Sequence, residues 1–385
     1  PEYLAVGTRK ITTPEPPEPE FLKLPDDWFV EPPPPPPPPV FAVPFPPPPP
    51  PPPEMVSFDL ANVPYDNLSD YHFFTGDNLK DLEPNEGMLL YEPISTLFSD
   101  YAHKLRYVWF PDGTQASYVS DTEVLDFPDG SVIVKTFYYD NVQPANERRI
   151  IETRLLYKKE GTWQFADYIW NDAQDEAVFN LDGSNTPVNF IDDDGTERNI
   201  DYRIPSESEC LTCHKKFGTS IPIGPKPQNL NSALDYADGN PMTNQLVKWQ
   251  SAGYLGEGFD VNAINTVIDW HDETQELAMR VRSYLDMNCS SCHREGGHCD
   301  YRPIRLAYSE TEVPANLGIC VPPDEFVAPG QINIITPGTP SKSALYYRIN
   351  SIEPMARMPL LGRSVVHEDA VSMIEEWISG LEDCD

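Results

Sequence analysis

The pattern Cys-x-x-Cys-His occurs twice in the chain. The first copy is "CLTCH" at 210–214, and the second is "CSSCH" at 289–293. With 7 Cys and 7 His in 385 residues, chance alone would produce one such copy about 0.002 times. The repeated pattern therefore indicates a chemistry that needs two thiols and one imidazole in a fixed order.

That chemistry is the covalent attachment of c-type haem. Two thiols form thioethers with the vinyl groups on one edge of the porphyrin, and the adjacent His reaches the iron as an axial ligand. We therefore predict two haem c groups. The attachment residues are Cys210, Cys213, Cys289 and Cys292, and the iron ligands are His214 and His293.

Two other uses of paired cysteines fit the sequence less well. A redox dithiol does not need a His after the second Cys, yet both copies have one. A zinc site made from both pairs would span the 76 positions from Cys213 to Cys289. The usual gap in a zinc ribbon is about 15–20 residues.

The sixth ligand of each iron decides between electron transfer and catalysis. For the second haem we expect Met358, which precedes a proline in "RMPLLGR", with Met355 as the second choice. Met358 as a flexible core filler is the other reading. For the first haem no residue is favoured, and its iron is open or bound by one of several residues: His72, His103, His271, His298, His367 or Met242.

Three cysteines lie outside the two motifs. Cys299 and Cys320 enclose a loop beside the second motif, so we predict a disulfide between them. Cys384 is then left over, either free or bonded to another chain. Arg302, Arg305, Arg357 and Arg363 are candidate partners for the haem propionates.

The chain divides into three predicted parts. Residues 1–54 form a proline-rich arm with eight prolines at 32–39 and eight more at 46–53. Each run predicts a polyproline II rod that acts as a spacer, or as a docking arm through the apolar residues Val40, Phe41, Val43 and Phe45.

The rest of the chain changes character near residue 205. Residues 55–204 are rich in β-branched and aromatic residues with turns such as "FPDG" and "KKEGTW", which predicts an all-β sandwich or barrel-like domain. The turn "DDDGTE" at 192–197 is more typical of a hairpin than of a calcium site. Residues 205–385 contain amphipathic stretches at 274–288 and 368–381, which predict a mainly α, cytochrome c-like domain carrying both haems.

Charge and hydropathy restrict partners and location. The 61 acidic and 27 basic residues give a net charge of -34, which disfavours nucleic acid and favours redox partners with basic surfaces. No apolar run is long enough for a transmembrane helix. Because the first residue is Pro1, we expect any export signal to have been removed. Haem attachment takes place on the oxidising side of a membrane, so we expect a periplasmic or extracellular protein.

Several stretches resemble a bacterial family of exported di-haem c-type cytochromes with a β-rich N-terminal half. They include "FPDGSVIVKTFYY", "YRIPSESECLTCH", "YLDMNCSSCH" and "RMPLLGR", within residues 90–380. The resemblance implies the same haem-binding cysteines and histidines and a Met358 ligand. The proline-rich arm lies outside it.

Three functions follow from these observations. The first is an exported carrier of single electrons. The second is a di-haem enzyme of the peroxidase type, in which the first haem is open and an acid or base lies nearby. The third is a subunit of a self-assembling cell-surface cytochrome filament, linked through the arm and Cys384.

Overall fold

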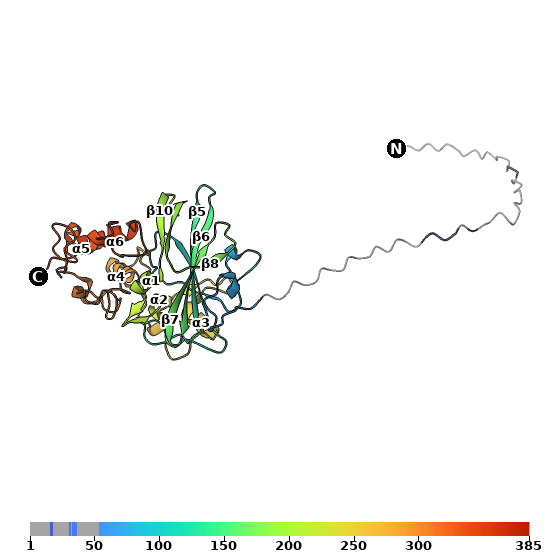
Figure 1. Cartoon of the computed structure of the whole chain (residues 1–385), viewed down its shortest axis with the longest axis horizontal. Helices are drawn as coiled ribbons and strands as arrows, with labels where there is room; N and C mark the ends of the chain where they lie inside the picture. The colour runs from blue at the N-terminus through green and yellow to red at the C-terminus, as the bar shows by residue number, and fades with distance from the viewer. Residues whose placement is uncertain (1–15, 18–30, 32, 37–53, 385) are drawn as a thin grey trace, which may run out of the picture. The chain divides into compact units, whose positions relative to one another are not determined.

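The computed structural model describes residues 16–17, 31, 33–36 and 54–384 (Figure 1). Except for 33–36, the predicted polyproline rods and the apolar patch between them lie outside the described residues. The segment Pro53–Asp385 forms one compact unit.

Eight antiparallel strands form the central sheet of this unit. Their order is β10-β9-β5-β6-β7-β8, with β4 also paired to β5 and β3 to β4. The strands are β3 (Leu89–Leu90), β4 (His103–Trp109), β5 (Val132–Val142), β6 (Glu147–Lys159), β7 (Thr162–Trp170), β8 (Ala177–Phe179), β9 (Ser184–Ile191) and β10 (Glu197–Ile204).

The turns of the sheet confirm the local sequence predictions. Glu160 and Gly161 alone connect β6 to β7, and both have positive φ, at 53° and 73°. Two such residues are what a tight hairpin between twisted strands requires. The acidic turn at 192–197 likewise joins β9 to β10.

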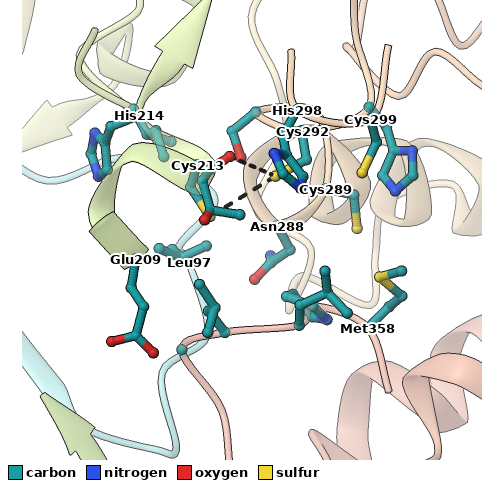
Figure 2. Close-up of a pocket in the computed structure, with 18 of the residues that line it drawn as sticks. Leu97, Glu209, Cys213, His214, Asn288, Cys289, Cys292, His298, Cys299 and Met358 are labelled. Atoms are coloured by element: carbon teal, nitrogen blue, oxygen red, sulfur yellow. Dashed lines mark hydrogen bonds between the residues drawn. The ribbon is translucent and has the colours of Figure 1, made fainter. Parts of the chain in front are cut away.

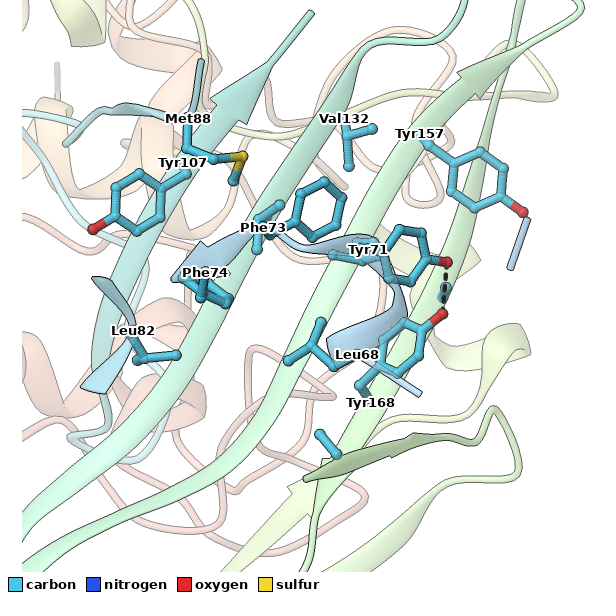
Figure 3. Packing of buried hydrophobic residues seen from close by; sticks show 14 of the residues in the cluster. Leu68, Tyr71, Phe73, Phe74, Leu82, Met88, Tyr107, Val132, Tyr157 and Tyr168 are labelled. Atoms are coloured by element: carbon cyan, nitrogen blue, oxygen red, sulfur yellow. Dashed lines mark hydrogen bonds between the residues drawn. The ribbon is translucent and has the colours of Figure 1, made fainter. Parts of the chain in front are cut away.

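One face of the sheet is covered by the segment that precedes it. Tyr71 and Phe73 pack on side chains of β5, β6 and β7, and the Tyr71 hydroxyl lies 2.7 Å from that of Tyr168 (Figure 3). The opposite face packs against the C-terminal part, where Leu156 shares a core with Leu230 and Trp249. The predicted sandwich or barrel is therefore wrong, because a single sheet is covered by non-sheet segments on both faces.

Six α-helices follow the sheet among the described residues. They are α1 (Glu207–Cys213), α2 (Pro227–Leu230), α3 (Gln245–Ser251), α4 (Leu277–Asn288), α5 (Ala344–Ile349) and α6 (Glu368–Ser379). Both amphipathic stretches are confirmed as helices, α4 and α6, which bury their apolar faces against each other.

The prediction of a mainly α C-terminal domain is nevertheless wrong. From Cys289 to Ser343 the described chain has no α-helix. This segment contains seven prolines between 303 and 340, and proline interrupts a helix because it lacks an N–H and clashes with the preceding turn.

The remaining elements are short. Three small antiparallel sheets each consist of two strands of two residues. They pair β1 (Phe74–Thr75) with β2 (Glu83–Pro84), β11 (Lys215–Lys216) with β12 (Thr219–Ser220), and β13 (Ala233–Leu234) with β14 (Thr243–Asn244). Single 3₁₀ turns occur at Ser69–Tyr71, Leu79–Asp81, Val261–Ala263, Pro314–Leu317 and Pro340–Lys342. No helix within the described ranges has the length and apolarity to cross a membrane.

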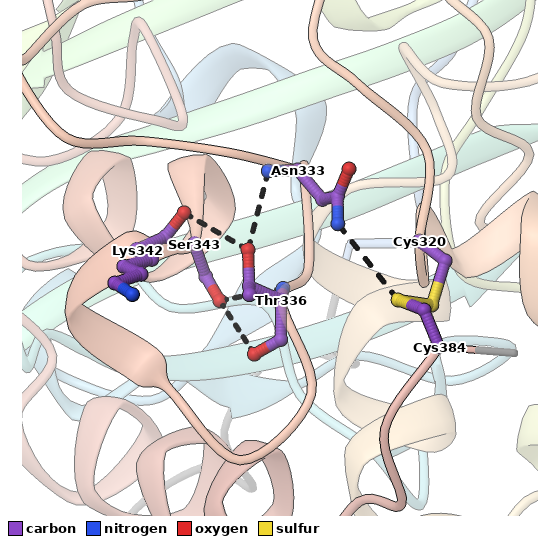
Figure 4. Close-up of a disulfide and its surroundings, with 6 residues drawn as sticks. All are labelled: Cys320, Asn333, Thr336, Lys342, Ser343 and Cys384. Atoms are coloured by element: carbon purple, nitrogen blue, oxygen red, sulfur yellow. Dashed lines mark hydrogen bonds between the residues drawn. A yellow bond between two sulfur atoms is a disulfide. The ribbon is translucent and has the colours of Figure 1, made fainter.

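The disulfide differs from the predicted one. Cys320 is bonded to Cys384, with 5.9 Å between their Cα atoms (Figure 4). Cys299 is buried as a free thiol beside the second motif, where its N–H donates to the Cys292 carbonyl at 3.0 Å. The pairing of Cys299 with Cys320 is therefore wrong, and Cys384 is neither free nor available to another chain. The short tail after α6 returns the C-terminus to Cys320, which sequence spacing does not reveal.

Candidate functional site

Both Cys-x-x-Cys-His motifs line one hollow between the sheet and the C-terminal helices. The hollow contains ≈ 2020 Å³ of space free of protein atoms, part of it open solvent. The Sγ atoms of Cys213 and Cys292 are 3.9 Å apart, and Cys289 and Met358 lie further along the hollow (Figure 2). The fold thus brings together two motifs that are far apart in the sequence.

The first motif is held by a short, well-capped helix. Ser206 and Glu209 form a capping box at the start of α1, and Arg203 pairs with Glu209 at 2.7 Å. The helix ends at Cys213, and the N–H of His214 still donates to the Cys210 carbonyl at 3.0 Å. This turn carries both thiols and the imidazole to the hollow.

The imidazole of His214 is oriented by a backbone group. Its Nδ1 lies 2.9 Å from the Ile221 carbonyl oxygen, so Nδ1 carries the proton and Nε2 keeps a free lone pair. Burial lowers the pKa of His214 to about 4. A neutral imidazole with a free Nε2 is the form that binds a metal.

The second motif begins where α4 ends and rests on a buried polar network. Asp286 accepts hydrogen bonds from Lys226 at 2.8 Å and from the Tyr308 N–H at 3.0 Å. The Asn288 side chain accepts from the Phe98 N–H at 2.8 Å. The three segments that carry Lys226, Tyr308 and Phe98 are therefore fixed against the end of α4.

The imidazole of His293 has a different environment. The backbone N–H of His293 donates to the Cys289 carbonyl at 3.0 Å, as the backbone N–H of His214 does to that of Cys210. Burial first, and then the positive charges of Arg302 and Arg305, lower the pKa of His293 to about 4. Its Nδ1 is buried and has no hydrogen-bond partner among the described residues.

Met358 lines the hollow, whereas Met355 points to solvent with 91% of its surface exposed. The Met358 N–H donates to the Arg348 carbonyl at 3.0 Å, and Arg363 Nε donates to the Met358 carbonyl at 3.0 Å. Arg363 is 4% exposed and also donates to the carbonyls of Arg348, Ser351 and Val365. The loop that carries Met358 is thus fixed from one side by a buried guanidinium.

Asp100 fixes the same loop from the sheet side. Its carboxylate accepts from the Ser364 N–H at 2.7 Å, from the Ser364 hydroxyl at 2.9 Å and from the Val365 N–H at 3.2 Å. Burial raises the pKa of Asp100, and these hydrogen bonds act in the opposite direction. We call Asp100 and Arg363 together the loop clamp.

Of the other candidate ligands within residues 54–384, His298 alone lines the hollow. His72, His103 and His271 lie near acidic side chains, His367 stacks on Phe98, and Met242 is 62% exposed.

Among the four arginines predicted near the propionates, only Arg302 lines the hollow, where it also pairs with Asp324 at 3.2 Å. Arg305 pairs with Asp300 at 2.8 Å, and Arg363 serves the loop clamp. Arg348 lines the hollow but was missed in the sequence.

The sheet supplies a polar wall that the sequence reasoning also missed. Arg154 and Asp167 are cross-strand partners on β6 and β7 and line the hollow with Tyr202. Glu152 is fully buried and accepts from Arg154 at 2.9 Å and from the Tyr202 hydroxyl at 2.6 Å. Charged residues at alternate positions of an otherwise apolar strand were the available signal.

The lining of the hollow would fit covalently held haem groups. Burial raises the pKa of Cys210 to about 11 and that of Cys289 to about 12, so both are uncharged thiols at neutral pH. Among the four motif cysteines, Cys292 alone has a lowered pKa, because its thiol is hydrogen-bonded with that of Cys213. Apolar side chains line the second-motif half, as a porphyrin requires: Ile304, Leu306, Ile334, Leu345 and Ile349.

In the part of the chain that the structure describes, no group of three or more His, Cys, Asp or Glu residues is arranged to hold a bare metal ion. No family model, curated protein or solved structure matches the chain.

Proposed function

We propose that this protein is an exported di-haem c-type cytochrome that transfers single electrons. The observation that carries the proposal is the convergence of both Cys-x-x-Cys-His motifs on one hollow, with Cys213 and Cys292 3.9 Å apart. Two motifs with separate functions would not be expected to line the same hollow. Groups attached to both motifs would lie close enough to exchange electrons.

The chain's own residues prepare the hollow for this role. Cys210, Cys213, Cys289 and Cys292 would hold the haem groups, and the neutral imidazoles of His214 and His293 would bind the irons. Haem iron, when bound, supplies the reversible one-electron couple. The clamped Met358 offers a thioether to the second iron, and such a ligand raises the reduction potential and leaves no site for a substrate.

Partners and location follow from charge and disulfide chemistry. A net charge of -34 over 385 residues steers encounters toward basic redox partners. The Cys320–Cys384 disulfide suits the oxidising side of a membrane, where haem c is also attached. We therefore place the protein in the periplasm or outside the cell.

The direct test is to count the haems on the protein. The chain would be secreted from a host that attaches haem c, and its intact mass and reduced absorption spectrum would be measured. We expect the mass of two haems. Each double variant, Cys210→Ala with Cys213→Ala or Cys289→Ala with Cys292→Ala, should lose one haem. Wild-type protein without covalent haem would refute the proposal.

A second candidate function is an enzyme with an open first haem. Asp167 is 2% exposed, and burial together with the Glu152 carboxylate raises its pKa well above the usual value. A protonated acid on the wall of the hollow is what a peroxidase-type reaction needs beside an open iron. Binding of cyanide by a high-spin haem, altered in Asp167→Asn, would favour this candidate. A fully low-spin spectrum that is insensitive to cyanide would exclude it.

A further inference from the structure

A row of basic residues crosses the face of the sheet that packs against the C-terminal part. Arg106 on β4 pairs in register with Lys135 on β5, and Lys135 pairs with Arg154 on β6. Lys104 lies two positions before Arg106 and therefore on the same face. These four residues form what we call the cationic row.

Three members of the cationic row have no acidic partner. Arg154 is paired with Glu152, but Lys104, Arg106 and Lys135 are absent from every ion pair among residues 54–384. Lys104 Nζ donates to the Ala102 carbonyl at 2.8 Å, and Arg106 makes a 3.5 Å contact with the Lys104 carbonyl. Lys135 Nζ lies over the Phe137 ring, 4.7 Å from its centroid.

Such an arrangement is costly unless an anion completes it. Arg106 is only 5% exposed, and lysine and arginine are rarely buried without a partner. Burial, followed by the charges of Arg106 and Arg154, lowers the pKa of Lys104 to about 7. The same causes lower the pKa of Lys135, on which Lys104 acts as well. The nearby carboxylates Asp100, Glu92 and Glu152 act on Lys104, Arg106 and Lys135 only from beyond ion-pair distance.

We infer that Lys104, Arg106 and Lys135 form a binding site for the carboxylates of the first haem's propionates. This inference rests on the proposed function. Of the cationic row, Arg154 alone lines the hollow that both motifs share; Lys135 is its in-register neighbour, and Arg106 lies one strand further. The first motif also lies beside this face, because the His214 ring packs on Phe165 of β7 with 5.4 Å between centroids. A porphyrin carries its propionates on the edge opposite the vinyl groups, so haem held by Cys210 and Cys213 would direct its carboxylates away from α1.

The chemistry of the site is recognition of an oxyanion, for which a soluble anion is the other source. Guanidinium and ammonium groups both bind carboxylate and phosphate. Propionates are the better fit because they belong to the haem that, in the proposed function, the adjoining hollow holds. The row would then stabilise the reduced first haem, whose added electron makes the site more negative.

The test compares two row variants, Lys135→Met and Arg106→Met, with a control. The control is Lys159→Met, which lies at the last residue of β6, outside the row. Intact mass would confirm two haems in each protein, and the haem potentials would be measured by redox titration. Met358→Ala, which targets the second haem, would identify its potential. We expect the potential of the first haem to fall in both row variants, with that of the second haem and the Lys159→Met protein unchanged.

The outcomes separate the two proposals. Two haems with an unchanged first potential in both row variants would overturn the propionate assignment alone. Wild-type protein without haem would overturn both proposals. An increase in wild-type melting temperature with added inorganic phosphate, absent in Lys135→Met, would assign the site to a soluble anion instead. Lys135→Met keeps a long unbranched side chain, so we expect the two-haem protein to fold, with a lower melting temperature because a propionate loses its cation.

Discussion

The two halves of the hollow carry the same motif in different surroundings. In the first half, His214 is oriented by a backbone carbonyl, and the facing wall is a β-sheet with buried charges. In the second half, the His293 Nδ1 has no partner in the described chain, and the loop clamp presents Met358. If the proposed haems are present, the difference teaches that the motif fixes their attachment, while the surrounding elements set what each iron can do.

The two halves also differ in how they are stabilised. The first half is built on a large hydrogen-bonded sheet. The second half consists of short helices and proline-rich loops, tied by the Cys320–Cys384 disulfide and the loop clamp. Changes in the second half should therefore affect its own haem and leave the first largely intact.

Replacing Met358 with Ala should have the largest effect. Loss of the thioether should remove the spectral signature of methionine ligation and lower the potential of the second haem, because Met raises it. The matched control is Met355→Ala, since Met355 is 91% exposed. Redox titration and absorption spectra of the oxidised proteins would measure both. Identical behaviour of the two variants would contradict Met358 as the ligand.

Replacing Cys320 with Ser should destabilise the second half. The disulfide closes a loop with a sequence separation of 64, and chain-entropy estimates give about 4 kcal/mol for a loop of that size. Denaturant unfolding would measure the loss, and thiol titration should detect the released Cys384. Cys299→Ser is the control, because Cys299 is already a free thiol. Release of a thiol in the Cys299 variant would restore the predicted pairing instead.

Replacing Asp100 with Asn should loosen the loop clamp without straining the backbone. Asp100 has a φ of 49°, which asparagine also tolerates. The amide cannot accept all the hydrogen bonds from Ser364 and Val365, so we expect a loss of about 1–3 kcal/mol and a weaker signature of methionine ligation. Exposed Asp112→Asn serves as the control. An unchanged signature would show that the clamp does not position Met358.

Near neutral pH the smallest effect should come from His367, whose ring stacks on that of Phe98 with 3.9 Å between the centroids. Burial lowers the pKa of His367 from 6.5 to about 3. The unfolded chain therefore binds its proton first, and the folded protein loses stability as pH falls from about 6.5 toward 3.

For one proton the slope is at most about 1.4 kcal/mol per pH unit. His367→Phe keeps the stacking and removes the titration, so its free energy of unfolding should depend less on pH in this window. Denaturant unfolding at a series of pH values would measure this. Equal slopes in the two proteins would mean that His367 does not titrate on unfolding.

Local features of the fold followed from short stretches of sequence. The turn at Glu160–Gly161 and the amphipathic helices α4 and α6 were predictable because spacing and turn residues act within a few positions. The overall C-terminal architecture was not, because two good helices say nothing about the 79 residues between them, 289–367, which include several prolines. The covering of both faces of the sheet also depends on contacts between segments that are distant in the sequence.

The sequence by itself determined the order of two thiol pairs, each followed by an imidazole, because the proposed covalent attachment would depend on neighbours along the chain. Only the tertiary structure decided which residues surround those groups. It paired Cys320 with Cys384, separated Met358 from Met355 by burial, and collected Arg106, Lys135 and Arg154 into one row. The physical reason is that burial and charge depend on distances through space, which spacing along a chain does not specify.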